Sequence, residues 1–372
     1  MNAELNKISS RSFMTRREFL KRTSIIAGAT ILFPMQQLIE QIIPLDNTKL
    51  GRVNAGKVDI KQKPNPDSLT VGSLYEDALV DWIREVVGKN PNRKNQRFVE
   101  TPEGYIWSPY LQPVRNLTNQ PVRTLPDSIS RGPGMWAEVS VPYVNLILDN
   151  PPARSPYVKS RLEYNLFPRL YYSQITWIDQ QKTNEDGHIL YRVNEPFGSY
   201  GDIFWAVGNA FRPISLEEIS PINPAIDEKR IVVNITYQTL SCFERLNEVY
   251  YCRISSGALW NAAGQAVDAW ATPIGSFPIW RKLLSLHMSG GSSGGGWDTP
   301  AVAWTSMFAG AGAAIHSTFW HNNFGEPMSH GCVNASPEDA KWIFRWTAPS
   351  IGLDTGELTI PWPGGTTVEV IE

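Results

Sequence analysis

The sequence predicts a mainly β protein in which two small β-barrel modules precede a larger β-rich C-terminal domain with few short helices. Aromatic residues are abundant (Trp 14, Tyr 13 and Phe 14), and Gly and Pro number 28 each. Together with the many β-branched residues, this composition favours short strands and turns over helical bundles. At 372 residues the chain has room for two or three domains, because one core seldom grows beyond about 250–300 residues.

The charge and the cysteine content exclude several classes of protein. A net charge of −2 provides no general electrostatic field for nucleic acid or anionic lipid. The three cysteines, Cys242, Cys252 and Cys332, are too few for a disulfide scaffold. Cys242 and Cys252 lie on a predicted hairpin that turns at residues 245–247, several residues out of register. We interpret them as small buried strand residues and leave a disulfide between them open.

Residues 1–47 are predicted to be an export signal or anchor followed by a tether. The pair Arg16-Arg17 precedes Phe19-Leu20-Lys21 and a short apolar run over residues 25–33. This order resembles a twin-arginine export signal. The apolar run is shorter than the roughly 20 residues that span a bilayer, and no Ala-x-Ala cleavage site directly follows it, so an uncleaved N-terminal anchor remains open. We expect export in folded form to the periplasm or cell envelope, on the outer face of the cytoplasmic membrane.

Two stretches repeat the same pattern of short apolar strands separated by turns. The first runs from Leu74-Tyr75 to Gln112-Pro113 and the second from Leu170-Tyr171 to Arg212-Pro213. The offset between matching residues runs from 96 (170 − 74) to 100 (213 − 113). Units of roughly 65–80 residues with this pattern are typical of small β-barrels. We therefore predict barrels over residues 51–115 and 136–216, and both resemble the bacterial Src-homology-3-type barrels that accompany wall enzymes.

The aromatic residues of these barrels allow two interpretations. Tyr105, Trp107, Tyr200 and Trp205 either fill the barrel cores or bind cell-wall polymer or peptide from exposed positions. Rings at alternating strand positions are more often core residues, so we favour packing. The segment from Pro221 to Pro224 marks a domain boundary, and the C-terminal domain is predicted to cover residues 226–372.

The candidate catalytic residues are concentrated in this last domain. His316-Ser317 is followed, after a loop, by Ser329-His330-Gly331-Cys332-Val333-Asn334. A free thiol is a poor nucleophile at neutral pH because its pKa is about 8.5, but a neighbouring imidazole can take its proton. The spacing of 16 (332 − 316) is too long for one helical face and suits two strands joined by a loop. These are the parts of an acyl-transfer site with Cys332 as nucleophile and His316 as general base.

Both strings resemble the signature of the L,D-transpeptidase catalytic domain (YkuD-type). The resemblance extends to other segments in the same order along the chain: residues 231–235 and 238–240, Ser255-Ser256-Gly257, Thr272-Pro273-Ile274-Gly275-Ser276-Phe277, Asp339-Ala340 and the closing strand 366–370. It implies a β-sandwich catalytic domain with few short helices. It also implies that the backbone carbonyl of Ser317 orients the imidazole of His316.

The remaining site residues are expected to support the reaction or to contact the substrate. Gly331 supplies an oxyanion-hole N–H, together with the amides of Cys332 and His330. His330 also supports the catalytic loop. Substrate contacts are expected from Ser329, Asn334, Trp304 and Trp320, although core packing of the two tryptophans remains open. His287 and His321 are interpreted as polar residues of the surface or groove wall.

Two further features of the sequence allow other interpretations. A zinc site built from the histidines and Cys332 matches no common ligand spacing, so neither a metal nor a cofactor is expected. The Gly-rich loop 289–296 lacks the Gly-Lys-Ser/Thr ending of a phosphate-binding loop. It is predicted to be either a lid over the substrate groove or a plain insertion.

The resemblance implies a cysteine-dependent peptidoglycan L,D-transpeptidase. The thiolate of Cys332 would attack the third residue of a tetrapeptide stem, release the terminal D-alanine and pass the acyl group to an amine. The expected partners are stem peptides, and cell-wall polymer through the barrels. Two alternatives remain, an L,D-carboxypeptidase that uses water as acceptor and a non-catalytic wall-binding protein. No nucleic-acid partner is expected. Contact with the membrane is expected only through the possible N-terminal anchor.

Overall fold

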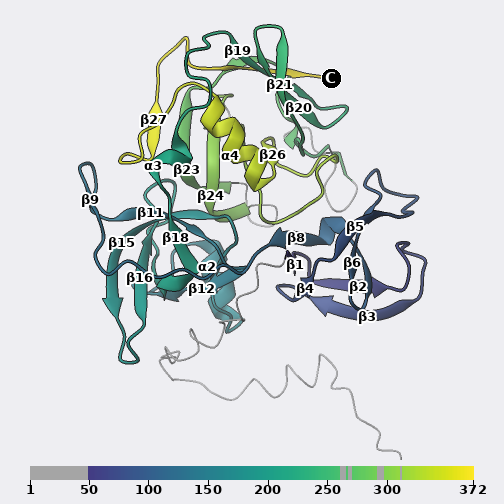
Figure 1. Ribbon diagram of the computed structural model, residues 1–372, viewed down its shortest axis with the longest axis horizontal. Coiled ribbons are helices and arrows are strands. Elements are labelled where there is room, and N and C mark those ends of the chain that lie inside the picture. Colours follow the sequence, from purple (N-terminus) through teal and green to yellow (C-terminus); the bar gives the residue numbers. More distant parts are fainter. Residues whose placement is uncertain (1–48, 260–264, 267–269, 291–296, 311) are drawn as a thin grey trace, which may run out of the picture. The chain divides into compact units, whose positions relative to one another are not determined.

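The computed structural model describes residues 49–259, 265–266, 270–290, 297–310 and 312–372, and all of them belong to one compact unit. The chain is mainly β with few short helices, as the sequence predicts (Figure 1). The predicted export signal and residues 291–296 of the predicted lid lie outside the described residues. Among the helices of the described ranges, none has the length and apolar character needed to cross a bilayer.

Residues 50–114, which we call the first module, form two sheets with a core of their own. The strand orders are β4-β1-β8 and β3-β2-β7-β6-β5. Alternation along β2 buries Val58 and Ile60, which pack with Val99, Ile106 and Leu111. The elements are β1 (Leu50–Val53), β2 (Lys57–Lys61), β3 (Thr70–Tyr75), β4 (Leu79–Asp81), β5 (Arg84–Val87), β6 (Arg97–Thr101), β7 (Gly104–Trp107), the 3-10 helix η2 (Ser108–Tyr110) and β8 (Leu111–Val114).

Residues 127–219, the second module, contain a six-stranded sheet of order β13-β17-β16-β15-β11-β18 and the pairs β10-β9 and β12-β14. It closes as the first module does, with a strand, one 3-10 turn and a last strand that pairs antiparallel with an early strand of the module. The elements are β9 (Asp127–Ser128), β10 (Gly132–Pro133), β11 (Met135–Val139), β12 (Tyr143–Asn145), β13 (Ile147–Leu148), α2 (Pro156–Glu163), β14 (Arg169–Tyr171), β15 (Ile175–Thr183), β16 (Ile189–Asn194), β17 (Ile203–Val207), η3 (Gly208–Ala210), β18 (Phe211–Pro213) and α3 (Leu216–Ile219).

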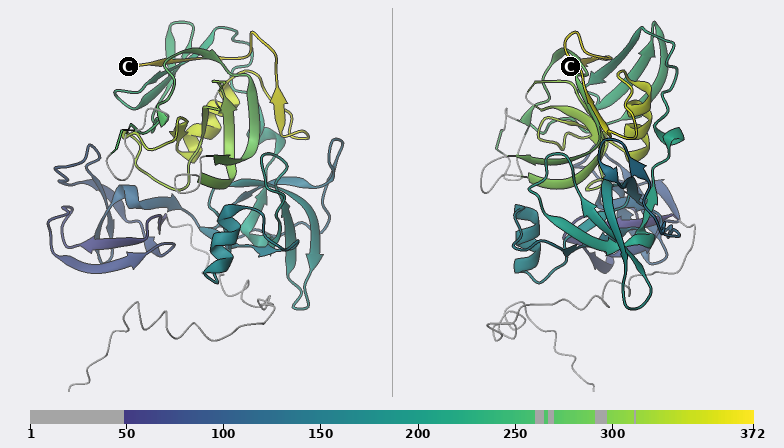
Figure 2. Two further views of the ribbon diagram at one scale, coloured as in Figure 1. Left: turned by 180° about the vertical axis from the view of Figure 1, so that it is seen from behind. Right: turned by 90° about the vertical axis from the view of Figure 1, so that its left-hand side faces the viewer.

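The C-terminal domain is built from two five-stranded sheets, of order β21-β20-β19-β28-β22 and β26-β25-β24-β23-β27. Its first and last strands, β19 and β28, pair in parallel. The sheets and the yellow-green helix α4 can be followed from behind and from the side in Figure 2. The elements are β19 (Lys229–Asn234), β20 (Thr239–Glu244), β21 (Asn247–Arg253), β22 (Gly275–Pro278), β23 (Arg281–Gly290), β24 (Trp297–Met307), β25 (Ala314–Ser317), β26 (Val333–Ala335), α4 (Pro337–Trp346), β27 (Glu357–Thr359) and β28 (Thr367–Ile371).

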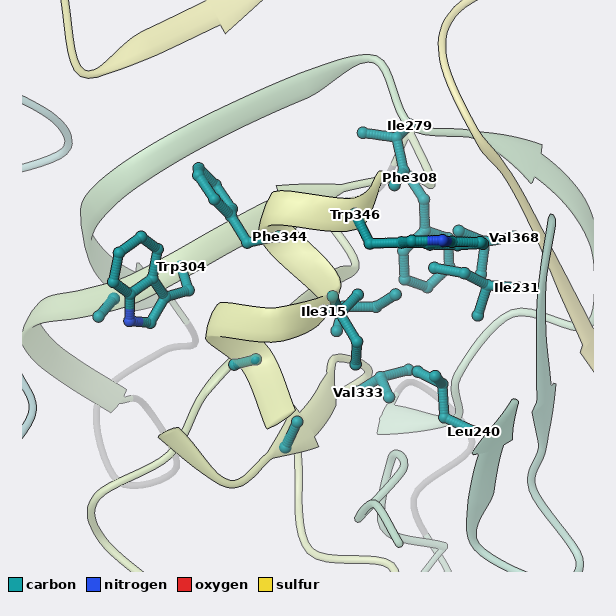
Figure 3. Packing of buried hydrophobic residues seen from close by; sticks show 14 of the residues in the cluster. Ile231, Leu240, Ile279, Trp304, Phe308, Ile315, Val333, Phe344, Trp346 and Val368 are labelled. Atoms are coloured by element: carbon teal, nitrogen blue, oxygen red, sulfur yellow. The ribbon is translucent and has the colours of Figure 1, made fainter. Parts of the chain in front are cut away.

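Helix α4 joins the two sheets through one core. Ser336 caps its N-terminus by accepting from the backbone N–H of Asp339, and Pro337 occupies the first turn. Ile343, Phe344 and Trp346 are buried, and the helix packs on β24, β25 and β26. Figure 3 shows Phe344 and Trp346 among side chains of both sheets, including Ile231, Val368, Ile315 and Val333. Strands β25 and β26, which flank the loop of residues 318–332, are therefore fixed by close packing. This loop carries Cys332, and we call it the catalytic loop after its candidate role.

The second module shares this core. Trp136 of β11 and Trp177 of β15 belong to the same buried cluster as the side chains of α4, and their rings meet edge-on at 5.4 Å between centroids. Gly356 of the C-terminal domain packs directly against the Trp136 ring. A Cβ there would lie 2.1 Å from the Trp136 ring, and the residue has a φ of +65°. Only glycine satisfies both conditions.

The cysteines of the β20–β21 hairpin are buried and free. Leu240 pairs with Cys252 and Cys242 pairs with Tyr250, so the two cysteines are offset by two residues across the strands. Burial raises the pKa of both thiols. Of the two alternatives left open by the sequence, the structure shows the small buried strand residues.

Candidate active site

Two neighbouring parallel strands place the candidate base and nucleophile in the wall of one cavity. His316 lies on β25 and pairs with Asn334 of β26, and Cys332 immediately precedes β26. Both side chains line one cavity of about 450 Å³. The long separation in sequence is thus closed by strand pairing.

The environment of His316 makes it a neutral base. Its Nδ1 lies 2.9 Å from the backbone carbonyl oxygen of Ser317. Because a carbonyl only accepts, Nδ1 carries the ring proton and Nε2 keeps its lone pair. The side chain is buried, and burial lowers the pKa of His316 to about 4, against the opposing effect of the bond to Ser317.

The thiol of Cys332 is protonated in this resting arrangement. Burial raises its pKa to about 11, although a hydrogen bond from the backbone of Ala314 opposes the shift. The sulfur lies 3.9 Å from the carbonyl oxygen of Gly312. The residue as a whole remains partly exposed. A neutral thiol and a neutral imidazole therefore face one cavity, and the proton has to move as the sulfur attacks rather than beforehand.

The catalytic loop is held by Ser329. Its backbone N–H donates to the carbonyl of Ser256 at 3.1 Å, and its hydroxyl donates to the carbonyl of Cys332. The same hydroxyl accepts from the N–H of Gly331 at 3.2 Å. The expected oxyanion-hole donor at Gly331 is thus already engaged in this conformation. The φ of +115° at Gly331 explains the glycine.

The other segments that resemble the L,D-transpeptidase family lie around this loop. Ser255 and Asn334 exchange two backbone hydrogen bonds of 2.9 Å. The N–H of Gly257 donates to the Thr272 hydroxyl at 2.8 Å. A Cβ at Gly257 would lie 1.9 Å from the carbonyl oxygen of Trp270. The Ser-Ser-Gly turn and the Thr-Pro segment therefore fix the position of the catalytic loop.

Aromatic rings form part of the cavity wall. His330 stacks on Trp297 at 4.5 Å and meets Trp270 edge-on at 4.3 Å between ring centroids. Burial lowers the pKa of His330, so its neutral ring packs well between two indoles. Trp320 also lines the cavity, with its ring 5.7 Å from that of His316. No sequence pattern indicates the contacts of Trp297 and Trp270 with His330.

Trp304 is a core residue and not a substrate contact. It is 1 % exposed, belongs to the core cluster and packs edge-on against Phe344. The structure thus favours the packing alternative for Trp304 and places Trp320 at the cavity. Ser329 and Asn334 line the cavity too.

His321 and His287 are buried, not surface residues. His321 accepts from the backbone N–H of Asn323 through Nδ1 at 3.2 Å, and its Nε2 lies 2.9 Å from the side-chain amide of Asn334. Burial lowers the pKa of His321 to about 3, with a smaller effect from His316. His321 therefore stays neutral, with its ring proton on Nε2, and lies against Asn334, the strand residue opposite the base.

His287 bridges two carboxylates behind the cavity. Its Nδ1 lies 2.8 Å from Glu195 of the second module, and its Nε2 contacts Asp298. Burial disfavours the charged ring, but the hydrogen bonds to Asp298 and Glu195 outweigh this and raise the pKa of His287 to about 9. Asp298 itself lines the cavity. No local sequence pattern indicates this arrangement.

The N-terminal modules complete the cavity wall. Glu76 comes from the first module, and Tyr157, Arg169 and Tyr171 come from the second. Within the described ranges no group of His, Cys, Asp and Glu side chains is arranged to hold a metal ion.

Comparison with known proteins supplies the family of the C-terminal domain. Residues 228–370 match the family model of the L,D-transpeptidase catalytic domain. No curated protein matches the chain.

The chain is also similar to solved structures at low sequence identity. The chain is similar to a mutant of the Enterococcus faecium L,D-transpeptidase (22% identity, 40% of this chain and 51% of that chain, TM-score 0.30). It is also similar to the catalytic domain from E. faecium L,D-transpeptidase (22% identity, 39% and 98%, TM-score 0.30) and to an L,D-transpeptidase from Mycobacterium smegmatis (16% identity, 50% and 90%, TM-score 0.31). The chain spans about half the length of the first of these. The family match assigns residues 228–370 to the L,D-transpeptidase catalytic domain.

Proposed function

We propose that this protein is a peptidoglycan L,D-transpeptidase that forms cross-links in the cell wall through a thioester on Cys332. The thiol gives its proton to Nε2 of His316 as the sulfur bonds to the carbonyl carbon of the third residue in a tetrapeptide stem. The bond to the terminal D-alanine breaks, and its nitrogen takes the proton from His316. An amine of a second stem then attacks the thioester, and its proton returns through His316 to the sulfur.

One observation carries this proposal: His316, in the tautomer with Nε2 unprotonated, lines the same cavity as the thiol of Cys332. A base with a pKa of about 4 is unprotonated throughout the neutral range, so it is ready to accept the proton. A thioester conserves the energy of the donor amide for an amine acceptor, so no nucleotide is required.

The proposal includes the location of the enzyme. The twin-arginine pattern of residues 15–33 supports export to the cell envelope, where stem peptides are found. The two N-terminal modules are proposed to be Src-homology-3-like barrels that contact wall polymer. Tyr110 of the first module (39 % exposed) and Tyr200 of the second (41 %) are exposed aromatic residues suited to such a contact.

Mass spectrometry of stem peptides after incubation with the protein tests this function. Dimers joined between two third-position residues, with release of D-alanine, are expected. Tripeptides without dimers would identify an L,D-carboxypeptidase, and unchanged peptides would indicate a binding protein. Cys332→Ala should abolish all products while the variant stays folded. A Cys242→Ala variant is the matched control, because that thiol is buried away from the cavity and should be dispensable.

A further inference from the structure

The cavity at Cys332 carries a charged residue that the catalytic domain does not supply. Arg169 lies on β14 of the second module and lines the cavity together with His316 and Cys332. It lies outside residues 228–370, the segment matched to the catalytic domain family.

Arg169 belongs to a cluster with one more cation than anion. Asp77 of the first module pairs with Arg52 at 2.7 Å and also with Arg169. The side chains of Arg52 and Asp77 are 3 % and 5 % exposed, and that of Arg169 is 19 % exposed. The Arg52–Asp77 pair is neutral on its own, so Arg169 adds a net positive charge where the cluster meets the cavity.

The guanidinium of Arg169 is held in place before any ligand arrives. Its Nε donates to Oδ1 of Asn145 at 2.9 Å, and its carbon lies 4.3 Å from the centre of the Tyr143 ring. Arg52 fixes the other side of Asp77 and donates to the Phe319 carbonyl at 3.0 Å, next to Trp320 of the cavity. An ordered guanidinium is well suited to a carboxylate, which it can bind through two parallel hydrogen bonds.

In the described part of the chain, neither of the two carboxylates that line the cavity, Glu76 and Asp298, forms an ion pair with Arg169. Asp298 contacts the His287 ring, accepts from the Ser155 hydroxyl at 2.6 Å and accepts from the N–H of Tyr157 at 2.8 Å. Glu76 adds a second carboxylate to the lining. The cavity thus contains both a cationic and an anionic position, as a peptide with carboxylates and an amino group requires.

We propose that Arg169 binds a carboxylate of the donor peptide and so makes the second module part of the substrate site. This inference rests on the proposed function. Two carboxylates of the donor peptide are candidates, the α-carboxylate of the terminal residue and the side-chain carboxylate of a dicarboxylic third residue. Binding to either orients the scissile carbonyl toward Cys332, and losing it affects KM and kcat together.

Three synthetic tetrapeptides test the proposal: one with both carboxylates free and two with one or the other converted to a carboxamide. Thioester formation on Cys332 is measured for the wild type, Arg169→Gln and Arg169→Lys. Lys159→Gln is the matched control, because it removes the same charge from an exposed position on helix α2 of the same module. In Arg169→Gln, Asp77 keeps Arg52 as a partner, so the variant should fold.

We expect Arg169→Gln to lower kcat/KM for the free peptide by about ten- to a hundredfold, with part of the rate recovered in Arg169→Lys. One carboxamide peptide should react equally slowly with the wild type and with Arg169→Gln, and that peptide identifies the carboxylate. Alkylation of Cys332 by neutral iodoacetamide should be the same in all variants.

Two outcomes would contradict the proposal. If Arg169→Gln slows all three peptides by one common factor, or slows iodoacetamide as well, the residue is structural and the inference is wrong. If the wild type forms no thioester with any peptide while iodoacetamide still alkylates Cys332, the proposed function fails and the inference fails with it.

Discussion

Both N-terminal modules end in a strand, a 3-10 turn and a last antiparallel strand, but they contact the catalytic domain through different kinds of interaction. The first module has an apolar core made only of its own residues. It reaches the catalytic domain through polar contacts, such as Asn322 to the Ser108 hydroxyl at 3.2 Å and the Lys94 N–H to Glu326 at 2.9 Å. The second module contributes Trp136 and Trp177 to the core of the catalytic domain itself.

Because of this difference, we expect the second module to contribute mainly to the stability of the catalytic domain and the first module mainly to its cavity. Burial of apolar surface stabilises by roughly 25 cal/mol per Å², whereas a single polar contact contributes only about 1 kcal/mol net, because both partners bond to water when it breaks. The second module should therefore be inseparable from the catalytic fold. The first should influence the cavity mainly through the Arg52–Asp77–Arg169 cluster.

The largest test of this comparison exchanges one tryptophan in each core. Trp136→Ala should lower the free energy of unfolding of the second module and the catalytic domain together by about 3–5 kcal/mol. Trp82→Ala, in the separate core of the first module, should leave hydrogen exchange over residues 228–370 unchanged. Equal loss of protection there in both variants would refute the separation.

A smaller effect is expected at the glycine that accommodates Trp136. Gly356→Ala should destabilise the protein by about 2–3 kcal/mol, because a Cβ would lie 2.1 Å from the ring at a φ of +65°. Gly187→Ala is the matched control, with a φ of +82° but no atom within 4 Å of the added Cβ. It should cost only the backbone strain, about 1 kcal/mol. Thermal unfolding of both variants measures the difference, and equal effects would mean that Trp136 is not closely packed there.

The ionic contact between the second module and β23 should make stability depend on pH. The folded pKa of His287, about 9, is above its ordinary value, so its contribution is complete below about pH 6.5 and is lost as the pH rises through 9. His287→Gln should thus destabilise the protein by about 3 kcal/mol more at pH 6 than above pH 9. Urea unfolding of both proteins at the two pH values gives this difference. A pH-independent penalty would mean that His287 is neutral in the folded protein.

The sequence predicted the parts of the site that depend on neighbouring strands. His316 and Cys332 could be found because a thiol beside glycine and a distant imidazole suit paired strands, which β25 and β26 provide. Strand alternation does not predict the side on which Trp304 lies, because Ala301 and Trp304 of β24 both have positive φ. Each such residue resets which side of the strand faces the core.

The parts that could not be predicted depend on contacts between distant segments. Glu195 meets His287, and Asp77 meets Arg169, each across 92 residues of chain. Charged residues without a local pattern are usually solvated, so nothing in the sequence distinguishes these from surface ions. The shared core has the same origin, because the apolar run of β11 indicates burial of Trp136 but not which domain covers it.

The central claim is that a neutral His316 takes the proton of Cys332 as the sulfur attacks, and the rate of thioester formation against pH tests it most directly. Intact-protein mass spectrometry with a tetrapeptide donor should show one acyl group on Cys332 and none in Cys332→Ala. Because protonation of His316 stops the reaction, the rate should fall by half near pH 4 and stay level from about pH 6 to 9. A rate that rises steadily toward the thiol pKa of about 11 in both the wild type and His316→Gln would contradict the account.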